Sequence, residues 1–514
     1  MKVTFPEAGS AGVNLDALAY EAPPAAWTSC KNMRFGTGYA ERFAGHDQAF
    51  GTLSSVPYAI FGFYSNVTRY VVYCDQDAVY AVVGGTHTDI TGTAPTGGSN
   101  DVWTGGVLPG GMLVLNNEAD EPMYWTGDTG ANLATLTGWD SNHRCKSMRV
   151  FKNFIFAVNV TKSSVSYDRL VMWSSSADVG ALPTSWTPSS TNDAGETDLS
   201  VSTPLVDAIE FGDSMYIFSE GETVKATYIG PPFIFNFQVI SRSHGLLAQR
   251  CATTVPGVGV FAVTHSDVVV HTGSESSRSV VEGRVKDYLF SNMSPTYYER
   301  TFVSRNLTKS EVWICYPSTA SNGECDKALV WNFATDTWGF RDLPNVTSGT
   351  EAMVEETPAE SFATVATNFD TDTMTFSDYD ITPKTTQRLL LSSASNEKIY
   401  SIDSGLDFDG TDITARIERT GLALGAPDKV KTLRSIRPRV DAVAGTTISV
   451  YAGGSFDPEG DVTWQGPFTY TVGTDLKVDA LISGRYLAVR FETTGSADWR
   501  LRSFDLDVVS QGDF

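Results

Sequence analysis

Short apolar stretches separated by polar turns recur along most of this chain. Residues 69–83, RYVVYCDQDAVYAVV, have the pattern of two strands around a Cys-Asp-Gln-Asp turn. In residues 329–344, LVWNFATDTWGFRDLP, an apolar run reaches Phe333, a polar turn covers 334–337, and Trp338 begins the return. Such patterns predict antiparallel β-hairpins. No long stretch has the i, i+4 periodicity of an amphipathic helix.

The strand pairs follow one another at a loose spacing of about 40–60 residues. Further examples are 110–126, 149–176, 208–229, 258–273, 311–318 (just before the hairpin at 329–344) and 388–403. Repeated antiparallel units that cannot each bury both faces are typical of a β-propeller. We therefore predict an all-β protein with a degenerate β-propeller of about six or seven blades over residues 56–404. A large β-sandwich assembly is the alternative interpretation.

Two regions lie outside this repeat. Residues 1–55 are punctuated by proline and glycine, and we expect an extended platform segment there. Residues 405–514 follow the acidic stretch DSGLDFDGTD at 403–412 and alternate cleanly between apolar and polar positions, as in GRYLAVRFETT. This alternation predicts a C-terminal antiparallel β-sandwich with one solvated face.

Composition narrows the class of protein. The chain has 514 residues, of which 41% are hydrophobic and 11% aromatic, and this excludes an intrinsically disordered protein. No stretch reaches the 18 apolar residues of a membrane-spanning helix, and the first residues lack the apolar core of a secretion signal. We expect neither membrane insertion nor export. The six scattered cysteines, without a C-x-x-C pair, are expected to be reduced and mostly buried.

The formal net charge of −23 is concentrated in the first 404 residues, which carry −19, whereas residues 405–514 carry −4. Such a surface repels nucleic acid and anionic membranes, but it is compatible with the wall of a channel through which DNA slides without binding. The basic run KVKTLRSIRPR is the exception. On one face of a strand, Lys429, Lys431, Arg437 and Arg439 would form a patch for an acidic neighbour, such as another copy of the chain.

No catalytic constellation is evident. Ser176, Asp178 and Gly180 begin a sialidase-type Asp box, but Trp186 comes three residues too late and no second copy follows. G-x-S-x-G, phosphate-loop and H-E-x-x-H motifs are missing from the sequence. We therefore predict that the protein is not an enzyme and needs no cofactor.

Metal sites are weakly indicated. His265, Asp267 and His271 would share a face of one strand, but at that spacing the two histidines are too far apart to chelate one ion. Acid-rich turns at 370–380, 403–412 and 457–461 are oxygen-rich, as Ca²⁺ sites are, yet they lack the fixed twelve-residue loop. Solvated turns are the preferred interpretation.

Four motifs, in order along the chain, resemble one family. APPAAWTSCKNMRFGTGYAERFAG (22–45) contains a proline-preceded tryptophan, an N-x-R-F strand, a glycine turn and a basic return strand. SADVGALPTSW, WNFATDTWGFRDLP and GRYLAVRFETTGSADWRLRSFDLDV follow it. Together they resemble the tail nozzle, or packaged-DNA stabilisation, proteins of short-tailed bacteriophages (podoviruses). The motif residues of the first segment are Trp27, Asn32, Arg34, Phe35, Gly38 and Arg42.

The resemblance implies a structural virion protein: a homo-hexameric ring at the distal tail that docks on the head–tail adaptor, retains packaged DNA and conducts it during ejection. It further implies contacts with tailspikes, fibres or a tail needle, and assembly in the host bacterial cytoplasm. Trp331 and Trp338 would brace a blade, and the loops 184–200 and 345–385 are candidate gates. Another phage tail or baseplate component and a carbohydrate-binding β-propeller are the alternatives.

Overall fold

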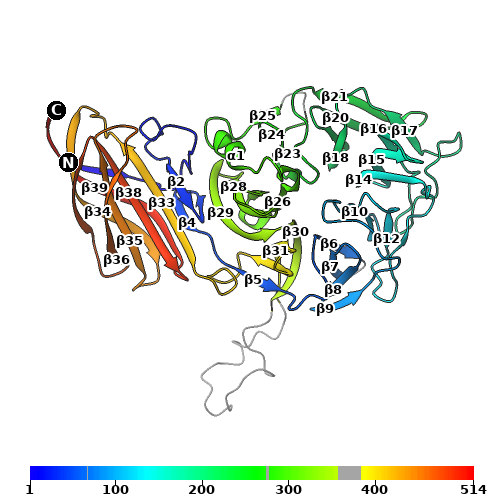
Figure 1. The fold of residues 1–514 in the computed structure, drawn as a ribbon, viewed down its shortest axis with the longest axis horizontal. Coiled ribbons are helices and arrows are strands. Elements are labelled where there is room, and N and C mark those ends of the chain that lie inside the picture. Colours follow the sequence, from blue (N-terminus) through cyan, green and yellow to red (C-terminus); the bar gives the residue numbers. More distant parts are fainter. Residues whose placement is uncertain (66–67, 274–276, 357–383, 514) are drawn as a thin grey trace, which may run out of the picture.

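The computed structural model describes residues 1–65, 68–273, 277–356 and 384–513, and nearly all of its regular structure is β-strand (Figure 1). Within these residues, seven four-stranded antiparallel units surround one axis, and each is a blade of a β-propeller. The predicted all-β fold with a β-propeller is confirmed, with seven blades. An antiparallel β-sandwich lies beside the propeller.

The first four blades follow one another along the chain. Blade 1 comprises β6 (Ala59–Ser65), β7 (Thr68–Cys74), β8 (Val79–Val83) and β9 (Thr86–Asp89). Blade 2 comprises β10 (Thr104–Leu108), β11 (Met112–Asn116), β12 (Met123–Trp125) and β13 (Ala134–Thr135). Blade 3 comprises β14 (His143–Phe151), β15 (Phe154–Lys162), β16 (Val165–Trp173) and β17 (Gly195–Asp198). Blade 4 comprises β18 (Leu205–Phe211), β19 (Ser214–Ser219), β20 (Thr223–Gly230) and β21 (Ile234–Ser241).

The remaining blades include the helical turns. Blade 5 comprises β22 (Ala252–Val255), β23 (Gly259–Val263), β24 (Val268–His271) and β25 (Ser277–Ser279). Helix α1 (Lys286–Asn292) and the 3-10 turn η1 (Tyr298–Arg300) precede blade 6, which comprises β26 (Phe302–Asn306), η2 (Leu307–Lys309), β27 (Glu311–Tyr316), β28 (Cys325–Asn332) and β29 (Thr337–Val346). Blade 7 comprises β30 (Ser348–Glu356), β31 (Lys384–Ser393), β32 (Lys398–Ile402) and β5 (His46–Ala49).

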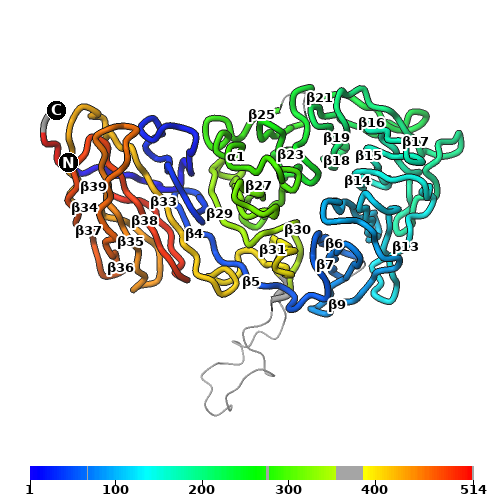
Figure 2. Tube along the Cα trace, in the orientation of Figure 1, coloured from blue at the N-terminus to red at the C-terminus, as the bar shows by residue number. Residues whose placement is uncertain are grey.

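The outermost strand of blade 7 closes the ring from the far end of the sequence. β5 pairs antiparallel with β32, in the register Ile402↔His46 to Ile399↔Ala49. The inner strand β30 also lies beside β6, the inner strand of blade 1 (Figure 2). Because the last blade contains a strand from the N-terminal part of the chain, the ring is held by paired backbone as well as by packed side chains.

The sandwich is formed by strands from both ends of the chain. One sheet has the order β2-β33-β38-β35-β36, with β2 (Ser29–Lys31), β33 (Ile413–Leu422), β38 (Tyr486–Gly495), β35 (Thr447–Ser455) and β36 (Thr463–Thr471). The facing strands are β4 (Tyr39–Arg42), β39 (Trp499–Asp513), β34 (Lys429–Ala442) and β37 (Val478–Gly484), with β1 (Lys2–Phe5) also paired to β39. On β33 buried and half-buried residues alternate, as the sequence pattern led us to expect.

Residues 1–55 do not form the separate platform that we expected. β1 and β2 belong to the sandwich, β5 belongs to blade 7, and β3 (Met33–Gly36) and β4 join the two parts. β3 meets the outer strand of blade 6 at the pair Phe340↔Met33, and β4 meets β39. Apart from the local β3–β4 hairpin, the short strands of this segment find their partners hundreds of residues away, and the hydrophobic pattern of the segment alone does not reveal those partners.

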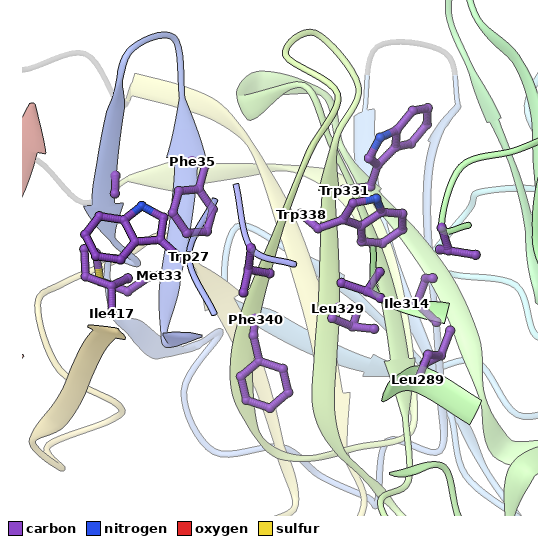
Figure 3. Packing of buried hydrophobic residues seen from close by; sticks show 14 of the residues in the cluster. Trp27, Met33, Phe35, Leu289, Ile314, Leu329, Trp331, Trp338, Phe340 and Ile417 are labelled. Carbon is purple, nitrogen blue, oxygen red and sulfur yellow. The ribbon is translucent and has the colours of Figure 1, made fainter. Parts of the chain in front are cut away.

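One hydrophobic cluster runs through the joint between propeller and sandwich. It includes Trp27 and Phe35 from the N-terminal segment, Trp331 from blade 6, Phe261 from blade 5 and Phe491 from the sandwich. Figure 3 shows Trp27 and Phe35 on one side of this region and Trp331 and Trp338 on the other. The joint is thus a packed core rather than a flexible linker.

Candidate functional sites: the propeller channel and the joint

The inner strands of the seven blades surround a central cavity of about 370 Å³. Its lining includes Ile60, Gly106, Val150, Ile209, Ala252, Val303 and Gly349, one residue from each blade in turn. The major groove of B-DNA is by itself about 12 Å wide, so a duplex does not fit inside a cavity of this size. The propeller cavity is therefore not a passage for a DNA duplex.

Asp207 ties three neighbouring blades together at the cavity wall. It lies on β18 of blade 4 and receives Nε and Nη2 of Arg149, on β14 of blade 3, at 2.8 and 2.6 Å. Ser147 donates to it at 2.5 Å, and the backbone N–H of Arg250, just before blade 5, donates at 2.9 Å. Burial raises the pKa of Asp207, but the ion pair with Arg149 outweighs this effect and holds the pKa below its ordinary value.

A buried ionic network lies where the N-terminal segment meets blades 6 and 7. Nη2 of Arg34, on β3, is 2.5 Å from Oδ1 of Asp403, and its Nε is 3.3 Å from Oε1 of Glu311 on β27. Arg341 on β29 is fully buried and lies 3.9 Å from Asp403. Asn306 adds a hydrogen bond to Asp403 at 3.0 Å. The network therefore fixes three sequence-distant segments relative to one another.

Burial and charge shift the ionisation of this network. Burial raises the pKa of Glu311 to about 7, because desolvation outweighs the attraction of Arg34. Burial also raises the pKa of Asp403, but Arg34 and Arg341 together hold it below its ordinary value. His46 on β5 is neutral at physiological pH, because burial lowers its pKa to about 3.

We expect Glu311→Gln to flatten the pH dependence of stability. A carboxyl group whose pKa is raised on folding binds more protons in the folded than in the unfolded state between its two pKa values. The wild type should therefore lose stability relative to Glu311→Gln as pH rises from about 4.5 to about 7. Urea unfolding at pH 5 and pH 7, followed by far-UV circular dichroism, measures this. An unchanged difference between the two proteins at both pH values would contradict it.

The family-motif residues lie at this joint. The indole of Trp27 donates to Ala8 O at 2.6 Å, and Phe35 is buried beside it in the same cluster. Asn32 donates to Thr414 O at 2.9 Å, in the sandwich, and accepts from Asp342 N at 2.8 Å, in blade 6.

The remaining motif residues belong to the hairpin of β3 and β4. Gly38 has φ +77° in its turn, a conformation that favours glycine. Arg42 on β4 donates to Gly495 O at 2.8 Å and to Leu406 O, so it reaches both the sandwich and the segment that follows blade 7. The first motif thus encodes contacts between the two parts of the molecule.

Trp331 and Trp338 face each other across the β28–β29 hairpin. They are a register pair with ring centroids 6.3 Å apart, and each is 1% exposed. The ring of Trp331 stacks on Phe261 of blade 5 at 5.5 Å, and the indole of Trp338 donates to Val280 O at 3.0 Å. Buried on all sides, neither indole offers a face to a sugar.

The basic run does not form one exposed patch. Lys429, Arg437 and Arg439 are exposed on β34, but Lys431 is 3% exposed and donates to Ala426 O at 2.6 Å. A register shift between Leu433 and Ser435 interrupts the alternation, so the two halves of the strand do not present one continuous face. Arg439 is also partly neutralised by Asp505 at 3.1 Å.

The histidine pattern is interrupted by a turn. His265 is exposed in the turn between β23 and β24, whereas His271 is buried at the end of β24, so our placement on one strand was wrong. The described residues contain no group of three or more His, Cys, Asp or Glu that could hold a metal ion. Of the acidic turns, 403–412 contains Asp403, which is buried in the ionic network, and 370–380 lies outside the described residues.

The segment from 176 to 200 is largely packed. Trp186 is 3% exposed and lies edge-on to Trp139 at 4.7 Å. The N–H of Gly180 donates to Pro109 O at 2.9 Å, which attaches this part of blade 3 to blade 2. Of the two predicted gate loops, 184–200 therefore contains a core residue and β17, and most of 345–385 lies outside the described residues.

Two further expectations concern cysteines and membranes. All six cysteines, which fall within the described ranges, are free thiols, and only Cys30 is not fully buried. No helix in the part of the chain that the structure describes has the length and apolar character to cross a bilayer.

No protein-family model matches the chain, and no curated protein matches it. Among solved structures it is similar to the WD40 β-propeller domain of Doa1, with 11% identity over 70% of this chain and 97% of that one, at a TM-score of 0.37. It is also similar to PorZ, an essential surface component of the type-IX secretion system of Porphyromonas gingivalis, with 9% identity over 76% and 44% of the two chains and a TM-score of 0.34. Such low scores support no argument about function.

Proposed function

We propose that this protein is a structural subunit of a short-tailed bacteriophage tail, forming the distal nozzle as a ring of six copies. The observation that carries the proposal is the ordered set of four sequence motifs that resemble the nozzle family. Supporting it, the residues of the first motif make the contacts that unite propeller and sandwich, which is the role expected of residues that define an architecture rather than a reaction.

Charge and channel size agree with a conduit formed between copies. The propeller cavity of about 370 Å³ leaves no room for a duplex, so DNA would pass along the outside of each propeller, through the middle of the ring. A chain with a net charge of −23 gives such a passage an acidic wall. An acidic wall repels the phosphate backbone and keeps DNA from binding during ejection.

The deciding experiment is electron microscopy of the purified chain at high concentration, alone and mixed with tails from a phage lysate. We expect a six-fold ring with a central hole, or added density at the tail tip. A ring that appears only on tails would also support the proposal, and it would mean that the head–tail adaptor triggers assembly of the ring. A single disc that never joins tails would overturn it.

The exposed part of the basic strand gives a sharper test of the ring. Arg437→Glu should reduce ring formation, because Arg437 is exposed on β34 and an acidic neighbouring copy would attract it. Arg278→Glu makes the same change of charge at an exposed position on β25 of the propeller and should leave ring formation as in the wild type. Analytical ultracentrifugation compares the two variants. Equal ring formation by both would rule out the basic strand as a contact.

A further inference from the structure

The wider mouth of the propeller channel is a second cavity, of about 520 Å³, at the end where the inner strands begin. Tyr58, Trp103 and Thr347 come from just before or at the starts of β6, β10 and β30, and Tyr297 comes from the segment before β26. The volume lies within the range of about 300–1,000 Å³ that is usual for small-molecule sites. The cavity is therefore large enough for a ligand the size of a monosaccharide.

Arg250 lines both the mouth and the channel below it, so it lies where the two cavities meet. Its backbone is fixed on both sides, because its N–H donates to Asp207 at 2.9 Å and its carbonyl accepts from Val303 N at 2.8 Å. The residue also has φ +63°, in the left-handed region. These contacts hold the side chain at the floor of the mouth.

The guanidinium of Arg250 has no counter-ion. Among the residues that the structure describes, it makes neither an ion pair nor a hydrogen bond, its Nε is buried without a partner, and its one ring contact is with Phe302 at 5.8 Å. The nearby carboxylate of Asp207 is already paired with Arg149 through two hydrogen bonds. Only the backbone N–H of Arg250 contacts Asp207, so this carboxylate does not balance the charge of the Arg250 guanidinium. Arg250 is half-buried at the cavity wall, and an anion supplied by a ligand would balance its charge and give its Nε a partner.

The other residues that line the mouth determine which kinds of anion it can bind. Five acidic side chains line it, against two arginines, one lysine and one histidine; the acids are Asp101, Glu118, Glu220, Glu299 and Glu324. Such a lining repels a polyanion such as nucleic acid. Tyr58 and Tyr297 supply aromatic surface, whereas Trp103 is 4% exposed and packs in the core of blades 1 and 2. The amide N–H groups of Asn100, whose Oδ1 accepts from Arg300, supply hydrogen-bond donors. These are the groups that pack on and bind a neutral, hydroxyl-bearing ring.

We propose that the mouth of the propeller binds a sugar that carries a single carboxylate, such as a uronic acid, with the carboxylate paired to Arg250. The guanidinium fork suits a planar carboxylate, which it can bind through two parallel hydrogen bonds. The aromatic side chains hold the body of the ring. This site is separate from the contacts that support the tail proposal, and either proposal can fail without the other.

Isothermal titration of the full chain with D-glucuronate, D-glucose and inorganic phosphate tests the site. We expect glucuronate to bind at least about tenfold more tightly than glucose, which lacks the carboxylate, and than phosphate, which lacks the ring. Equal affinity for glucuronate and glucose would overturn the role of the charge. Phosphate binding as tight as that of glucuronate would show an adventitious anion site and overturn the sugar.

Arg250→Met removes the charge while keeping the apolar stem. It should abolish the preference for glucuronate over glucose without lowering the Tm of the ligand-free protein, because the charge that it removes is uncompensated. Tyr297→Ala should weaken both sugars and keep the preference, which tests the site even if Arg250→Met folds poorly. Arg502→Met, a control on the sandwich, should bind like the wild type. Unchanged glucuronate binding by Arg250→Met would overturn the proposal.

Discussion

Replacing Arg34 by methionine is expected to lower the free energy of unfolding by about 3–5 kcal/mol, the range seen when one partner of a buried ion pair is removed. Arg34 is 6% exposed and lies between Asp403, at 2.5 Å, and Glu311, at 3.3 Å. Without it, the buried carboxyl groups of Asp403 and Glu311 lose the cation that lies between them. Guanidinium unfolding followed by far-UV circular dichroism measures the loss.

Arg502→Met is the matched control for this prediction. Its ion pair with Asp441, at 2.5 Å, joins two side chains that are 55% and 50% exposed. Exposed pairs of this kind contribute about 0–1 kcal/mol. Arg34 holds β3 against blade 6 and the segment that follows blade 7. Equal effects of Arg34→Met and Arg502→Met would mean that the network does not stabilise the joint.

Trp331→Ala is expected to cost about 3–5 kcal/mol, as large-to-small changes of buried aromatic residues do. The indole stacks on Phe261 of the neighbouring blade and on Trp338 across the hairpin, and its N–H donates to Asp336 at 3.0 Å. The substitution therefore opens a cavity between blades 5 and 6. Far-UV circular dichroism in guanidinium is the measurement, since it does not depend on tryptophan emission.

The companion variants separate packing from binding. Trp331→Phe keeps an aromatic ring and should lose less stability than Trp331→Ala. Tyr167 lies on β16 and is 46% exposed, so Tyr167→Ala should lower the free energy of unfolding by under about 1 kcal/mol. A Trp331→Ala protein as stable as Tyr167→Ala would contradict the packing role. If Trp331→Ala lost a specific interaction with a glycan at unchanged stability, that result would instead favour a carbohydrate-binding propeller.

The sequence was most informative where partners are near in the chain. The hairpin at 329–344 was predictable because both strands and the turn lie in one stretch, and in the structure Asn332 accepts from the N–H groups of Ala334 and Thr335 within that turn. The repeat of such hairpins predicts a propeller. Closure of the ring by β5 was not predictable, because nothing local to residues 46–49 specifies β32 as their partner.

The site escaped prediction for a related physical reason. Arg250 and Asp207 are single polar residues in separate blades, and only the circular arrangement of inner strands brings them to one cavity. Similarly, Asp403 lies in an acidic stretch that resembles a solvated turn, yet it is the buried partner of Arg34. An alternating pattern placed Lys431 at the surface, and an irregularity in β34 turns it inward. Each case depends on geometry between distant segments.

The pairing of both chain ends into shared sheets has a consequence for biosynthesis. β1 pairs with β39 and β5 with β32, so strands that are made early pair with strands made several hundred residues later. Contacts so distant in sequence are slow to form, because the loop-closure entropy is lost before the contact is gained. The ring cannot close before β32 has been made, and the sandwich cannot be completed before β39 has been made. Completion of the sandwich is thereby restricted to chains in which synthesis has reached β39.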